Sequence, residues 1–172
     1  MTALTDAVAG DLVGWEGLTE DLSPAALESQ LGIHWTVDPA PRQRASSVFT
    51  VLHGERPEAP QELDAWMRVG DSEVTALEFR PPALLDHTAV LADLGDPELV
   101  LPSNHFEAGS AVKEHVHAER GITVAVAEPF TDEGNARYIV HVQLYRPMST
   151  QAFLTEVGPS GETLRAYPRP PA

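Results

Sequence analysis

Residues 90–95 read Val-Leu-Ala-Asp-Leu-Gly, and similar segments occur at residues 27–32 (Leu-Glu-Ser-Gln-Leu-Gly) and 153–158 (Phe-Leu-Thr-Glu-Val-Gly). The glycines that end these segments lie 63 residues apart both times, at positions 32, 95 and 158. Apolar residues four apart, followed by a glycine, are typical of a helix that ends on a left-handed residue. The segments therefore predict three short helices. Their expected N-caps are Ser23, Asp86 and either Ser149 or Thr150.

A second pattern also occurs twice. Residues 74–81 (Val-Thr-Ala-Leu-Glu-Phe-Arg-Pro) resemble residues 140–147 (Val-His-Val-Gln-Leu-Tyr-Arg-Pro), and both read as a strand that ends in an aromatic residue, arginine and proline. Between each of the first two glycines and the next Arg-Pro pair there is room for three strands. The predicted strands cover residues 45–52, 63–69, 73–79, 111–117, 121–127 and 138–145. Residues 63–69 also fit the apolar face of a helix, so both alternatives stay open there.

The order helix, three strands, helix, three strands, helix predicts an α+β fold. We expect two tandem repeats, each a helix followed by a three-stranded antiparallel meander, and a closing C-terminal helix. The predicted units are an N-terminal arm or short helix (1–20), the first repeat (21–82), the second repeat (83–148), and the C-terminal helix with a proline-rich tail (149–172). Helices on one sheet face would leave the other face available to solvent or to a partner.

The passage from the second helix into its strands resembles known proteins. Residues 94–97 (Leu-Gly-Asp-Pro), followed by strands that include residues 119–122 (Glu-Arg-Gly-Ile), resemble the small helix-plus-sheet domain of the outer-membrane assembly lipoproteins. Two such units in tandem are similar to the β-lactamase inhibitory protein family, in which two repeats form a concave sheet that grips an enzyme. The resemblance implies a binding scaffold without catalytic activity.

The charge of the chain restricts its partners. The 172 residues carry a formal net charge of −15, with 26 acidic and only 11 basic side chains. Such a field repels phosphates and anionic lipid, so we expect no nucleic acid and no membrane surface among the partners. It favours encounter with a basic protein. The chain has no cysteine, which excludes disulfides and thiol catalysis and fits a cytoplasmic location.

One histidine motif suggests a metal site. Residues 109–117 (Gly-Ser-Ala-Val-Lys-Glu-His-Val-His) resemble the opening of the cupin metal motif, in which two histidines share one strand face. His115 and His117, two residues apart on a strand, would point the same way, and Glu119 could add a carboxylate. A divalent transition metal is the cofactor of this alternative. The other reading is a pair of solvent-facing histidines and no cofactor.

The predicted strands also assign side chains to faces. Val112 and Val116, the apolar residues of 122–126, and Val140 with its alternate neighbours are expected to face the helices. The opposite face would then present polar and aromatic groups suited to recognition of a protein. The residues predicted for partner binding are Trp66, Arg68, His115, His117, His141, Gln143 and Tyr145.

No catalytic motif accompanies these residues. The sequence contains no Gly-x-Ser-x-Gly nucleophile elbow and no glycine-rich phosphate loop. The leading hypothesis is therefore a non-enzymatic, acidic protein-binding module of inhibitor, immunity or adaptor type. The alternatives are a cupin-like metal-dependent enzyme and a structural subunit of a larger assembly, docked through residues 4–15 or 167–172.

Overall fold

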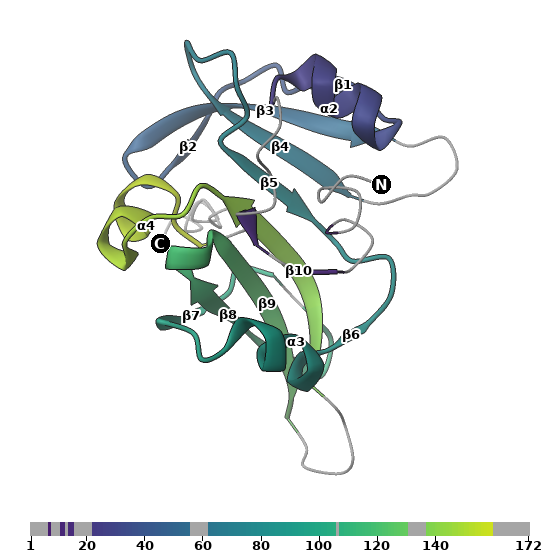
Figure 1. Cartoon of the computed structure of the whole chain (residues 1–172), viewed down its shortest axis with the longest axis vertical. Coiled ribbons are helices and arrows are strands. Elements are labelled where there is room, and N and C mark those ends of the chain that lie inside the picture. Colours follow the sequence, from purple (N-terminus) through teal and green to yellow (C-terminus); the bar gives the residue numbers. More distant parts are fainter. Residues whose placement is uncertain are drawn as a thin grey trace, which may run out of the picture.

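The computed structural model of the chain describes residues 7, 11–12, 14–15, 22–55, 62–105, 107–130 and 137–159. Figure 1 shows a twisted sheet with short helices packed against it. In chain order the elements are α2 (Pro24–Leu31), β1 (His34–Val37), β2 (Arg42–Arg44), β3 (Ser47–Glu55), β4 (Leu63–Arg68), β5 (Ala76–Phe79), β6 (Leu85–Asp86), α3 (His87–Leu94), β7 (Leu99–Pro102), β8 (Ser110–His117), η2 (Ala118–Arg120), β9 (Ile122–Pro129), β10 (Tyr138–Tyr145) and α4 (Thr150–Glu156). Within the described part of the chain, no helix has the length and apolar character needed to cross a membrane.

The ten strands in the described part of the chain form one antiparallel sheet. Its order is β1-β3-β4-β5-β10-β9-β8-β7, while β2 pairs with β3 and β6 pairs with β10. At the centre β5 pairs with β10, so that Ala76 lies opposite Tyr145 and Phe79 lies opposite Val142. Helices together with an antiparallel sheet confirm the predicted α+β class.

The three predicted helices are present. Gly32 follows α2 with a φ of 63°, and Gly95 follows α3 with a φ of 79°. Both values lie in the left-handed region that glycine adopts without steric conflict. The N-cap residues are Ser23, Asp86 and Ser149, each of which accepts a hydrogen bond from a backbone N–H of the first turn.

Each of the six predicted strands overlaps an observed strand, namely β3, β4, β5, β8, β9 or β10. Residues 63–68 are strand β4, which decides against the helical alternative. The sequence pattern does not predict β1, β2, β6 or β7, so the expected count of three strands after each helix is wrong. These strands have only two to four residues, and β1 and β7 are largely exposed, so they carry no apolar alternation.

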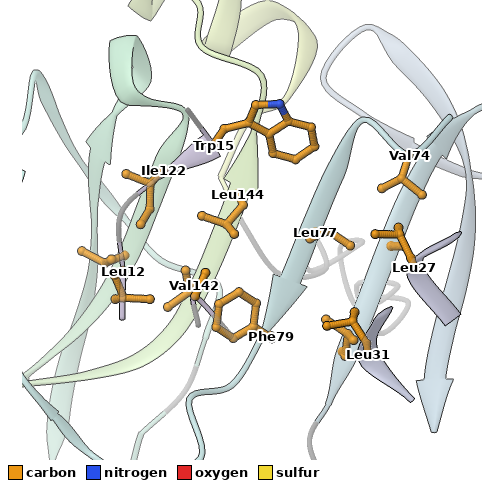
Figure 2. Packing of buried hydrophobic residues seen from close by; sticks show 14 of the residues in the cluster. Leu12, Trp15, Leu27, Leu31, Val74, Leu77, Phe79, Ile122, Val142 and Leu144 are labelled. Atoms are coloured by element: carbon orange, nitrogen blue, oxygen red, sulfur yellow. The ribbon is translucent and has the colours of Figure 1, made fainter. Parts of the chain in front are cut away.

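One face of the sheet, here called the helix face, packs against α2 and α3. Leu27 and Leu31 of α2 belong to the same buried cluster as Leu77 of β5, and Figure 2 shows them along this side of the strands. Leu12 and Trp15, from the predicted N-terminal arm, are buried in the same cluster. The rest of that arm, apart from residues 7, 11 and 14, and the predicted tail beyond residue 159 lie outside the described residues.

The opposite face, here called the α4 face, is covered as well. Phe153, in the middle of α4, and Val157, just beyond its end, belong to a second buried cluster with Tyr145 of β10. The backbone N–H and the hydroxyl of Ser46 both donate to the carbonyl of Thr155, at 3.0 and 2.7 Å, and tie α4 to the β2–β3 turn. Figure 1 shows α4 beside that turn. The expectation of an open sheet face is therefore wrong here, because the closing helix folds back onto it.

Candidate functional site

Most residues predicted for partner binding are buried. Their exposed fractions are 4% for Trp66, 8% for His115, 1% for His117, 8% for His141 and 0% for both Gln143 and Tyr145. Arg68 is partly exposed, with 42% of its side chain accessible. The prediction that these residues share one exposed surface is wrong, because helices and loops cover both sheet faces. A role for them in binding stays a prediction.

His115 and His117 lie on the helix face, opposite to the face that the sequence predicts for them. His115 pairs with Val124 and His117 pairs with Ile122 across β8 and β9, and directly paired residues share a face. Val124 and Ile122 belong to the helix-face core. Val116, expected on the helix face, packs instead in the α4-face cluster. The strand is thus predicted correctly, but its two faces are exchanged.

The two histidines form a buried cluster with His87 at the start of α3. The rings of His87 and His115 meet edge to face, with centroids 4.8 Å apart. Burial lowers the pKa of all three, to about 4 for His117, so the rings are neutral near pH 7. Among the described residues, no group of three or more His, Cys, Asp or Glu side chains is arranged to hold a metal. The predicted set of His115, His117 and Glu119 is therefore not assembled, and the cupin-like alternative gains no support from the geometry.

The remaining predicted residues make internal contacts on the α4 face. His141 stacks on His105 with ring centroids 4.0 Å apart, and burial lowers the pKa of His141 well below its ordinary value. Gln143 donates a hydrogen bond of 2.9 Å to the Glu78 carboxylate. Burial raises the pKa of the Tyr145 phenol, which therefore stays protonated.

A pocket of about 270 Å³, here called the arginine pocket, opens between β3–β5 and α4. It contains two of the predicted residues, Trp66 and Arg68, and three of the 11 basic residues of the chain. Its lining residues are Arg44, Phe49, Trp66, Arg68, Asp71, Thr75, Ala76, Arg146, Met148, Glu156 and Val157.

The floor of the arginine pocket is held by a buried ion pair and two ring contacts. The Arg44 guanidinium lies 3.7 Å from the centre of the Trp66 ring, and Phe49 meets that ring edge to face at 5.7 Å. Arg44 forms an ion pair with Glu78, and only about one-twentieth of either side chain is exposed. Since Glu78 also accepts from Gln143, the floor is anchored to β5 and β10 at the centre of the sheet.

The rim of the arginine pocket carries two arginines that, unlike Arg44, are exposed to solvent. Arg68 pairs with Glu156 of α4, and Arg146 pairs with Glu73, each at 2.5 Å. The four side chains are 42–56% exposed. Exposed ion pairs contribute only about 0–1 kcal/mol, so these guanidinium groups can exchange partners at little cost.

A second concavity, here called the acidic hollow, adjoins the arginine pocket. It has a volume of about 310 Å³ and is lined by Gly70, Asp71, Ser72, Glu73, Thr75 and Arg146. Asp71, Thr75 and Arg146 line both spaces, so the two adjoin each other along the turn between β4 and β5.

The sequence patterns do not single out Arg44, Arg146 or Glu156 as site residues. Arg146 stands in the recurring aromatic-Arg-Pro pattern, which was a usable signal. Arg44 lies in the pocket because of its contacts with Glu78 and Trp66, and Glu156 because α4 returns to the sheet; these are long-range contacts without a local pattern.

Comparison with known proteins returns no match for this chain among protein-family models, curated proteins or solved structures.

Proposed function

We propose that this chain is a non-enzymatic, acidic protein-binding module of inhibitor, immunity or adaptor type, and that the arginine pocket is the centre of its binding surface. The observation that carries the proposal is the gathering of Arg68, Arg146 and an aromatic floor at one concave place in a chain of net charge −15. Tryptophan, arginine and a pocket surrounded by charged residues are typical of binding hot spots.

The proposed partner is a basic protein. The acidic surface attracts such a partner over distance and repels nucleic acid and anionic membranes, while the arginine pocket supplies a local contact. The absence of cysteine supports placing this interaction in the reducing cytoplasm.

We also propose that the two halves are tandem repeats, with boundaries near residues 21–82 and 83–148. Strands β1-β3-β4-β5 and β7-β8-β9-β10 are two antiparallel series, each in chain order, with β2 outside the first, and they meet through their last strands. Across the central junction Ala76 pairs with Tyr145, and Phe79 pairs with Val142. Residues 76 and 142 are 66 positions apart, as are residues 79 and 145, so the shift that relates the two halves converts one pair into the other. An experimental structure in which the halves failed to superpose would contradict this.

The binding proposal can be tested by affinity capture with a matched pair of variants. Immobilised wild type, Arg68→Ala and Arg137→Ala are exposed to a lysate of the source organism at about 50 mM and about 500 mM NaCl, because salt screens exposed charges. Arg137 is 58% exposed and lies at the other end of β10 from Arg146, so Arg137→Ala controls for the loss of one positive charge.

We expect wild type and Arg137→Ala to retain the same basic protein at low salt, and Arg68→Ala to lose it. Retention by all three proteins alike would remove the arginine pocket from the proposal. No specific retention by wild type would overturn the proposal itself.

A further inference from the structure

We infer that the arginine pocket binds the C-terminal residue of the partner, one with an apolar side chain and a free α-carboxylate, preceded by basic residues. This rests on the proposed function and specifies its ligand. The shape and charge of the two adjoining concavities carry the inference.

The apolar part of the ligand would lie on the floor of the pocket. Phe49, Trp66 and Val157 line it, and the ion pair of Arg44 with Glu78 keeps the indole in place. A space of about 270 Å³ accommodates one large residue rather than a folded element. The partner group that enters is therefore a single side chain with its adjacent backbone.

The carboxylate would bind to the rim arginines. Arg44 is committed to Glu78 beneath the floor, whereas Arg68 and Arg146 are held by exposed carboxylates. A ligand carboxylate that replaces Glu156 or Glu73 gives up an exposed pair and gains a charge-assisted, forked hydrogen bond in a place that the ligand itself shields from water. Arginine suits this exchange because its guanidinium matches a carboxylate in two parallel bonds.

The residues before the C-terminus would lie in the acidic hollow. Asp71 lines both concavities, and its carboxylate has no hydrogen bond or ion pair with the other described residues. When Arg146 turns to the ligand, Glu73 is released in the same hollow. Two carboxylates beside the entrance favour lysine or arginine upstream of the terminal residue, in agreement with a basic partner.

A C-terminal residue fits better than an internal acidic side chain. The apolar floor and the two arginines line one space of about 270 Å³, so the ligand must present its apolar group and its carboxylate within a single residue. Only the last residue of a chain carries an apolar side chain and a carboxylate on the same Cα. Capture of a terminal carboxylate is a known mode of peptide recognition.

The test uses four peptides with the intact protein and isothermal titration calorimetry at about 50 mM NaCl, where exposed charges are weakly screened. The first is Ac-Ala-Lys-Arg-Phe as the free acid, and the second is its C-terminal amide. The third is Ac-Ala-Glu-Glu-Phe as the free acid, which reverses the upstream charge. The fourth is Ac-Lys-Arg-Glu-Phe as the amide, which offers an internal carboxylate only.

We expect the first peptide to bind at least about tenfold tighter than its amide, because the amide loses the charge-assisted bonds to arginine. The third and fourth peptides should also bind more weakly than the first. Arg68→Ala and Arg146→Ala should remove the preference for the free acid, whereas Arg137→Ala should keep it. Circular dichroism of each variant confirms that it is folded.

Equal binding of acid and amide, or an acid preference that survives both rim substitutions, would overturn the inference. Binding of the fourth peptide as tight as the first would assign the carboxylate to a side chain and would also overturn it. If no peptide binds while capture of a basic protein depends on Arg68, the inference fails and the proposed function stands. If the capture fails as well, both are wrong.

Discussion

Two sets of buried polar side chains lie on opposite faces of the same sheet, and they are stabilised in opposite ways. On the α4 face, Arg44 and Glu78 form an ion pair, and Gln143 donates a further hydrogen bond to the carboxylate. On the helix face, both ring nitrogens of His115 and Nε2 of His117 are buried without a hydrogen-bond partner among the described residues. The two sets are buried to a similar degree, with 1–8% of each residue exposed for Arg44, Glu78, His87, His115 and His117.

The contrast shows two ways to bury an ionisable group. A charge can be buried when a partner of opposite sign and further hydrogen bonds replace water, and removal of one partner is then very unfavourable. A histidine can be buried without such a partner by remaining neutral, and its burial then becomes unfavourable only when acid protonates it. The first set should therefore be sensitive to substitution and the second to pH.

The largest effect is expected from Glu78→Gln, which keeps the shape of the side chain and removes its charge. Arg44 stays buried but loses the negative charge of Glu78, and because it keeps a further interaction we expect the lower end of the range of about 3–5 kcal/mol for the fall in the free energy of unfolding. Urea denaturation followed by circular dichroism measures the change. Glu73→Gln is the matched control, since Glu73 pairs with Arg146 while 56% exposed, and its effect should be below about 1 kcal/mol. Equal effects of the two substitutions would show that the buried ion pair contributes no more to stability than the exposed one.

The second effect concerns the histidines and appears as a dependence of stability on pH. Burial, together with the electrostatic effects of His115 and Arg120, lowers the pKa of His117 from its ordinary 6.5 to about 4. Below pH 6.5 the unfolded chain therefore binds protons that the folded chain does not, so stability is complete above about pH 6.5 and falls continuously towards pH 4. A pKa difference of this size corresponds to roughly 3 kcal/mol for this one residue.

His117→Gln isolates this contribution because glutamine does not titrate. The variant should lose less stability than wild type between pH 6.5 and pH 4, whatever its stability at neutral pH. Urea denaturation at a series of pH values gives the two slopes. Identical slopes would mean that His117 binds a proton equally well in the folded and unfolded chains.

The faces of β8 illustrate what the sequence pattern can predict in this fold. Alternation shows that His115 and His117 share one face and that Val112 and Val116 share the other. It does not show which of the two faces meets α2 and α3 when both are buried, and a shift by one residue exchanges them. Val116 is buried on the α4 face in the same apolar cluster as Phe153. It is therefore shielded from water on the side that the pattern assigns to solvent.

Strand β10 and the arginine pocket show where prediction from local sequence ends. The register of β10 shifts between Ile139 and His141, so Val140 packs with Ala125 and Ala127 on the α4 face rather than on the helix face. The strand could be predicted, whereas the bulge has no local signal here. The pocket likewise depends on the return of α4 to the sheet, and only Trp66 and Arg68 among its residues belong to the predicted set.

A smaller effect is expected from Ser103→Ala on the α4 face. The Ser103 hydroxyl donates a 2.9 Å hydrogen bond to the carboxylate of Glu114, a fully buried residue. A hydrogen bond to a charged group contributes about 1.5–3 kcal/mol, and because Glu114 has further interactions we expect the lower end of that range. Thermal and urea unfolding measure the loss. Ser72→Ala, at an exposed serine, should stay within about 0.5 kcal/mol of wild type, and a comparable loss there would contradict the argument from burial.

The smallest effect on stability is expected from Arg68→Ala, and it bears directly on the proposed site. Arg68 and Arg44 line the same pocket, yet Arg68 is 42% exposed and its pair with Glu156 should contribute less than about 1 kcal/mol. Arg44→Ala should lower stability several-fold more, because it leaves Glu78 buried without its cation. Urea denaturation of both variants tests this division of roles. If Arg68→Ala were as destabilising as Arg44→Ala, the rim would belong to the structural framework, and a loss of binding in that variant could not be assigned to the pocket. A stable Arg68→Ala protein that fails to bind would instead separate the arginine that holds the floor from the arginine that meets the partner.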